Sequence, residues 1–136
     1  MFRISHILFI LLLSLSSFGA TKGIEASQAF FNEISNIFID ANPEKYSYHL
    51  SKNVDIMLDN DAAIYSKTQA QIVLKNYLQK INPQEFKIKY RSYTDKNDFL
   101  YLISTLTASE GLYNIYITMR WESNSYKIIE IKFRPL

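Results

Sequence analysis

Residues 98–134 read DFLYLISTLTASEGLYNIYITMRWESNSYKIIEIKFR and alternate apolar with polar side chains along three segments. This period of two is typical of half-buried β-strands. Ser109-Glu110-Gly111 and Ser123-Asn124-Ser125 interrupt the alternation with turn-forming residues, so neighbouring strands are expected to pair antiparallel through short loops. A further strand is expected before them. The predicted strands are Glu85–Tyr93, Asp98–Ala108, Leu112–Glu122 and Tyr126–Arg134.

The same alternation assigns each side chain of this sheet to one of two faces. The apolar set is expected to meet the helices and form the core: Phe86, Ile88, Tyr90, Leu100, Leu102, Leu106, Tyr113, Ile115, Ile117, Met119, Trp121, Ile129, Ile131 and Phe133. The opposite, outer face is expected to be basic and rich in Tyr and Thr, and it is expected to include Tyr126 and Ile128. Part of it forms a candidate interaction patch: Lys87, Lys89, Arg91, Tyr116 and Arg120. Three interpretations stand for this patch: a solvated sheet face, a dimerisation face, or a surface for an anionic or glycan ligand.

Helical spacing of apolar residues predicts a first helix over residues 26–41. Asn42-Pro43 ends it and can begin a short second helix, Pro43 to Leu50. Val54–Leu58 and Ala62–Tyr65 are expected to form a short hairpin around the turn residues Asn60-Asp61.

A third helix is predicted to begin at Ser66, which forms a capping box with Gln69, and to end at Asn82-Pro83. The predicted fold class is therefore α+β, with three N-terminal helices packed on a curved antiparallel sheet and the hairpin placed before the third helix.

This order of elements resembles the cone-shaped fold of nuclear transport factor-like proteins, which include ketosteroid isomerase and polyketide cyclases. It is similar, more narrowly, to a family of small exported bacterial proteins that carry a domain of unknown function with this fold. The residues behind the resemblance are VDIML at 54–58, YSKTQA at 65–70, GLYNIY at 111–116 and YKIIEI at 126–131. The resemblance implies a cone used as an enzyme, a binding pocket or a dimerisation module. No residue here matches the carboxylate base and the acid pair of the isomerases.

The first twenty residues follow the pattern of a secretory signal peptide. Arg3 precedes the apolar run Ile7–Leu13, and small residues follow it. Ser17 and Gly19 favour cleavage after Gly19, which gives a signal peptide over residues 1–19 and a single domain over residues 20–136. A retained membrane anchor is the alternative, but the apolar run is short for a bilayer span of about 20 residues.

Composition excludes several classes of site. The chain has 136 residues and contains no cysteine, so disulfide frameworks, thiolate metal sites and cysteine nucleophiles are excluded. The net charge is +2, and removal of Arg3 with the signal peptide leaves +1, which is too weak to indicate a nucleic-acid partner. His49 is a lone histidine after the signal peptide, and Asp55, Asp59 and Asp61 lack the spacing of a calcium loop, so no metal site is predicted.

Four aromatic residues are candidates to line a pocket inside the cone: Tyr77, Tyr90, Tyr113 and Trp121. The alternative is that they are core aromatics with satisfied polar groups. No catalytic residue and no cofactor are predicted. The sequence favours an exported, periplasmic or extracellular, non-catalytic module that binds a small hydrophobic ligand or a protein. The alternatives are a pocket enzyme of the isomerase or hydrolase type, or a structural homodimer.

Overall fold

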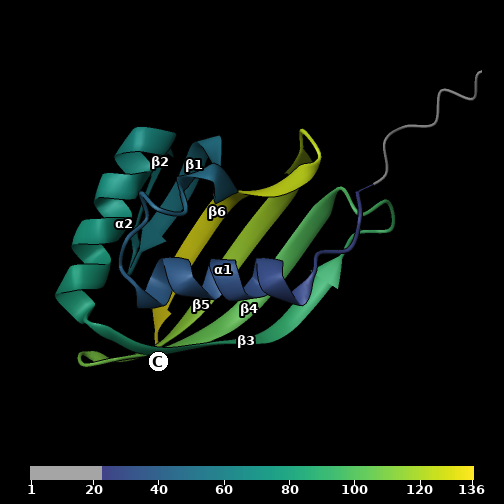
Figure 1. The fold of residues 1–136 in the computed structure, drawn as a ribbon. Coiled ribbons are helices and arrows are strands. Elements are labelled where there is room, and N and C mark those ends of the chain that lie inside the picture. Colours follow the sequence, from purple (N-terminus) through teal and green to yellow (C-terminus); the bar gives the residue numbers. More distant parts are fainter. Residues whose placement is uncertain (1–22) are drawn as a thin grey trace, which may run out of the picture.

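A computed structural model describes residues 23–136, in which two α-helices pack on one curved six-stranded sheet (Figure 1). The predicted signal peptide lies outside the described residues. The elements are α1 (Gln28–Ile39), the 3-10 turn η1 (Ser47–His49), β1 (Leu50–Leu58), β2 (Asp61–Ser66), α2 (Lys67–Ile81), β3 (Pro83–Tyr93), β4 (Phe99–Ala108), β5 (Gly111–Glu122) and β6 (Ser125–Pro135). The α+β class, the four C-terminal strands and the hairpin before the last helix are confirmed.

The sheet is mixed, whereas an antiparallel sheet was predicted. Its order is β2-β1-β6-β5-β4-β3, and β1 pairs parallel with β6 while every other neighbouring pair is antiparallel. The local loops predicted the antiparallel meander from β3 to β6 correctly. They carry no information about β1 and β6, which are far apart in the sequence and meet only when the meander returns to the hairpin.

The predicted second helix, Pro43 to Leu50, is wrong. The chain there makes turns with hydrogen bonds three residues apart, such as Tyr46 N to Pro43 O at 3.2 Å and His49 N to Tyr46 O at 3.0 Å. Leu50 already belongs to β1 and is paired with Ile128 of β6. Because β-pairing takes the backbone groups from Leu50 onward, too few residues remain for an α-helix, and only the three-residue turn η1 forms.

The two helices begin at side-chain caps that the sequence provides. The Ser27 hydroxyl accepts from the N–H of Phe30 at 3.2 Å at the start of α1. The capping box predicted for α2 is confirmed, because Ser66 and Gln69 each accept a hydrogen bond from the other's backbone N–H. Among the described residues, no helix is long and apolar enough to cross a membrane.

Each helix covers a different half of the sheet's inner face (Figure 1). α1 packs on β3, and α2 packs on β1 and β2. Phe38 of α1 is completely buried, and its ring stacks on Phe86 of β3 with a centroid distance of 4.6 Å. Ser104 of β4 is also completely buried, and its hydroxyl finds no hydrogen-bond partner within residues 23–136. His49 and Ser51 are also buried, and the other buried residues of the described chain are apolar.

A β-bulge in β6 reverses part of the predicted face assignment. Thr118 pairs with Glu130 but Met119 pairs with Ile128, so Ile129 is an extra residue in β6. The alternation therefore changes phase at Ile129. Tyr126 and Ile128, predicted on the outer face, are buried in the core, and Ile129, predicted inside, is only half-buried.

A second bulge does the same in β3. Ile88 pairs with Ser104 and Tyr90 pairs with Ile103, so Lys89 is the extra residue. Tyr90, predicted on the inner face, is 58% exposed on the outer side. Arg91, predicted on the outer face, instead lies on the helix side of the sheet, against Phe31 of α1. Strict alternation cannot reveal such an insertion, because a bulge shifts every later residue by one.

Candidate functional site: the groove between α1 and β3

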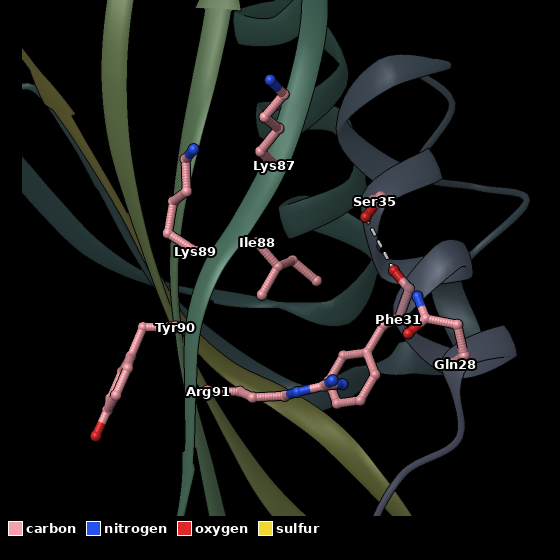
Figure 2. Close-up of a pocket in the computed structure, with 8 residues that line it drawn as sticks. All are labelled: Gln28, Phe31, Ser35, Lys87, Ile88, Lys89, Tyr90 and Arg91. Atoms are coloured by element: carbon pink, nitrogen blue, oxygen red, sulfur yellow. Dashed lines mark hydrogen bonds between the residues drawn. The ribbon is translucent and has the colours of Figure 1, made fainter.

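A surface groove of about 450 Å³ runs between α1 and the edge strand β3 (Figure 2). Three of its residues come from α1 and five are consecutive in β3. The lining residues are Gln28, Phe31, Ser35, Lys87, Ile88, Lys89, Tyr90 and Arg91. The groove thus unites Tyr90, predicted for an internal pocket, with Lys87, Lys89 and Arg91, predicted for the outer-face patch.

The bulge at Lys89 divides these cationic side chains between the two sides of β3. A regular strand would direct Lys87, Lys89 and Arg91 to the same face. The extra residue instead brings Arg91 toward α1, while Lys87 and Lys89 extend away from the helix (Figure 2). Cationic groups therefore surround the edge of β3 on both sides.

Arg91 is held in place by an aromatic ring. Its guanidinium carbon lies 4.4 Å from the centroid of the Phe31 ring, which is a cation–π geometry. Phe31 is itself buried, and its backbone carbonyl accepts a hydrogen bond from the Ser35 hydroxyl at 2.9 Å. The contact holds the guanidinium over the ring, while Arg91 as a whole stays exposed to solvent at the groove.

The groove is suited to bind negative charge. None of its lining residues is acidic, and the carboxylate of Glu85 lies 3.0 Å from the Lys87 ammonium. This ion pair is exposed on both sides, so water weakens it and it leaves Lys87 available to a competing anion. The Ser35 hydroxyl is bonded within its own helix. The arrangement offers charge and hydrogen-bond donors, and it offers no activated nucleophile.

Only two of the four residues predicted to line an internal pocket come together. Tyr77 and Tyr113 are both buried and their ring centroids lie 6.5 Å apart, edge to face. Trp121 packs elsewhere, on Tyr126 at 5.0 Å, and Tyr90 lies at the surface groove. Burial raises the pKa of Tyr77, whose hydroxyl donates to Asp59 at 3.4 Å.

Two residues of the predicted patch remain on the outer face, away from the groove. Tyr116 pairs with Ile103 and Lys132 and borders a second surface hollow of about 440 Å³. Arg120 is bonded to the carboxylate of Glu122, 2.5 Å away. Gln28, Phe31 and Ser35 were not predicted as site residues, because helical spacing alone does not reveal which strand a helix will pack against.

His49 forms a separate polar cluster that joins α1 to η1. Its Nε2 lies 2.8 Å from Oε2 of Glu33, and the Tyr48 hydroxyl donates to the same oxygen at 2.6 Å. The hydrogen bond from Tyr48 lowers the pKa of Glu33, and the same bond raises the pKa of Tyr48 to about 12. Within residues 23–136, no group of three or more His, Asp or Glu residues is placed to hold a metal ion.

We expect this cluster to make the stability of the protein depend on pH. Burial lowers the pKa of His49 below 6.5 despite the bond to Glu33, so below pH 6.5 the unfolded chain binds more protons than the folded one. We therefore expect the melting temperature to fall between pH 7 and pH 5.5, and to fall less in His49→Gln. If scanning calorimetry gave the same dependence of melting temperature on pH for the wild type and for His49→Gln, this assignment would be contradicted. The lowered pKa of Glu33 adds a loss of stability at still lower pH.

Comparison with known proteins places the chain in a family. The sequence profile of a domain of unknown function, DUF4783, matches residues 31–134, which contain most of α1 and all of η1, α2 and β1 to β5. The chain belongs to the DUF4783 family. Among curated proteins, none matches it in sequence.

Solved DUF4783 structures share the fold. The family member from Bacteroides uniformis has 17% sequence identity and a TM-score of 0.71, with 77% of this chain and 95% of that chain covered. The one from Bacteroides ovatus has 16% identity and a TM-score of 0.72, with 85% and 98% covered. An NTF-2 like protein of unknown function from Silicibacter pomeroyi has 10% identity and a TM-score of 0.58, with 79% and 91% covered. The resemblance to a domain of unknown function with a nuclear transport factor-like cone is thus confirmed.

Proposed function

We propose that this DUF4783 chain is a non-catalytic binding module of the cell envelope that takes an anionic ligand in the α1–β3 groove. The observation that carries the proposal is that Lys87, Lys89 and Arg91 border one groove whose lining residues include no acid. The charged start, apolar run and small-residue exit of residues 1–19 support export.

The placement of the three cations favours an extended ligand over a single small anion. Lys87 and Lys89 extend away from α1 and Arg91 extends toward it, so the three do not converge on one point (Figure 2). A ligand that carries several negative groups along its length meets them one after another. We infer that the ligand is an acidic peptide segment held by its side chains.

The packing of the interior supports a module without catalysis. An isomerase or hydrolase that works inside the cone needs a pocket between the helices and the sheet. That region holds side chains in mutual contact, among them Tyr77, whose ring lies 4.8 Å from Phe133 and 6.5 Å from Tyr113. The same packing disfavours a small hydrophobic ligand inside the cone. The surface groove is the better candidate.

Titration calorimetry with octaglutamate as the probe tests the proposal. Lys89→Glu replaces an attraction to the peptide with a repulsion, which weakens the binding free energy by about 1–2 kcal/mol. We therefore expect the affinity for the peptide at low salt to fall about five- to thirtyfold. Lys52→Glu is the matched control, because it makes the same charge change at an exposed site on β1, outside the groove. We expect the wild-type affinity to decrease with added salt, since the charges are exposed.

Two results would count against the proposal. Equal losses in Lys89→Glu and Lys52→Glu would mean that the peptide responds to net charge alone. Displacement of the peptide by inorganic phosphate at equal concentration would mean that the groove takes a single anion and not an extended acidic chain.

A further inference from the structure

One wall of the α1–β3 groove is the edge of β3 and not one of its faces. Five consecutive residues, Lys87 to Arg91, line the groove. Alternate side chains of a strand point to opposite faces, so a groove bordered by all five follows the edge of the strand. Among the described strands, β3 is the outermost on this side of the sheet. One row of its backbone N–H and C=O groups therefore has no neighbouring strand.

The hydrogen bonds of the β3–β4 hairpin show which backbone groups of β3 point toward the groove. The Thr94 N–H donates to the Phe99 carbonyl at 3.1 Å, so the residues opposite Phe99 and opposite every second β4 residue after it bond to β4. Ile88 and Arg91 lie opposite the intervening β4 residues, so their N–H and C=O groups point away from β4. Within the part of the chain that the structure describes, no other backbone segment bonds to them.

The bulge at Lys89 does not prevent a further strand from pairing here. Ile88 lies opposite Ser104 of β4. Arg91, three residues further along β3, lies opposite Leu102, which is only two residues from Ser104. A regular strand thus already spans the bulge on one side of β3, and an extended peptide can span it on the other. The groove of about 450 Å³ between α1 and β3 gives such a peptide room.

The charges along this edge select an acidic strand over a second copy of β3. Lys87, Lys89 and Arg91 are exposed. Basic side chains protect an edge strand from pairing with its own kind, because like charges on neighbouring strands repel each other. Two antiparallel copies of β3 paired around Lys89 would bring all six cations together. An acidic chain instead meets each cation with an opposite charge.

We propose that the acidic peptide binds as an additional β-strand at the edge of β3. Its main chain pairs with the N–H and C=O groups of Ile88 and Arg91, while its carboxylates meet the cations of the groove. This inference rests on the function proposed above and adds the conformation of the ligand. It also separates a peptide from other extended polyanions, which carry the charges but have no amide groups to pair with β3.

Three forms of octaglutamate with the same charge test the proposal in titration calorimetry: unmodified, N-methylated at every second residue, and N-methylated at every residue. The second form keeps one complete hydrogen-bonding edge, so its affinity should stay within about twofold of the unmodified peptide. The third form has no amide N–H to donate, so its affinity should fall about tenfold. Equal binding of all three, or equal losses in both methylated forms, would overturn strand addition and leave the proposed function intact. If unmodified octaglutamate did not bind, both would be overturned.

Amide hydrogen exchange of the protein, followed by NMR, locates the pairing. Saturating octaglutamate should slow exchange of the Ile88 and Arg91 N–H groups about tenfold or more. Ile64 is the matched control, because its N–H points outward from the opposite edge strand, β2, where the Leu58–Asp61 pair closes a two-residue turn. Its exchange should not change. Unchanged exchange at Ile88 and Arg91 in the saturated complex would contradict the proposal, as would equal slowing at Ile64, which would indicate a general stabilisation.

Discussion

Tyr126→Ala is expected to lower the free energy of unfolding by about 3–5 kcal/mol, the cost of removing a large aromatic side chain from a core. Tyr126 is 2% exposed, and its ring packs on Trp121 at 5.0 Å and Tyr93 at 5.9 Å. Its hydroxyl donates to the carbonyl of Asn97 at 2.7 Å. Urea unfolding followed by tryptophan fluorescence measures this loss of stability. Tyr126→Phe removes only the hydroxyl, so it should lower the free energy of unfolding by about 1 kcal/mol.

Tyr90→Ala is the matched control for this prediction. Tyr90 is 58% exposed, so the same truncation there should cost less than about 1 kcal/mol. Strict alternation along the strands predicts the opposite ranking, with Tyr90 inside and Tyr126 outside. A larger loss for Tyr90→Ala than for Tyr126→Ala would therefore contradict both bulges, and with them the position of Arg91 in the groove.

Phe38→Ala is expected to cost a similar amount, about 3–5 kcal/mol. Phe38 is completely buried, stacks on Phe86 at 4.6 Å with parallel rings, and lies 6.0 Å from Phe133. It fastens α1 to β3 and β6, so its removal loosens one wall of the groove from the other. Denaturant unfolding measures the stability loss.

Phe38→Leu provides the control, because it keeps apolar volume and removes the stacking. It should cost clearly less than Phe38→Ala. If the two variants were equally stable, the position would not be packed as described. If Phe38→Leu also weakens octaglutamate binding, the groove depends on the exact placement of α1 as well as on its charges.

Local patterns in the sequence predicted the local structure well. The capping box of Ser66 and Gln69 begins α2, and the turns after Ala108 and Glu122 separate antiparallel strands. Each of these features depends on residues a few positions apart, so the sequence carries the information directly. The helix prediction over Pro43–Leu50, which was wrong, also depended on a local signal. A favourable cap and a proline predict a helix only where long-range strand pairing does not compete. Here the pairing of Leu50 with Ile128 did compete.

The candidate site could be predicted only in part. Lys87, Lys89 and Arg91 were recognised as a basic cluster, but they were assigned to a flat outer face shared with Tyr116 and Arg120. The structure divides this set between a groove and the outer face. The groove needs α1 beside β3 and a bulge at Lys89, and neither is visible in hydrophobic periodicity.

The amino-acid sequence by itself determined the class of the fold, the positions of the C-terminal strands and the resemblance to a family of unknown function. Periodicity, caps and turns are short-range properties, and they hold wherever the segment is placed. The tertiary structure alone decided the parallel contact of β1 with β6, the two bulges and the groove. Those features arise because distant strands must align their hydrogen bonds while their apolar side chains fill one core, and a single extra residue in β3 or β6 satisfies both demands.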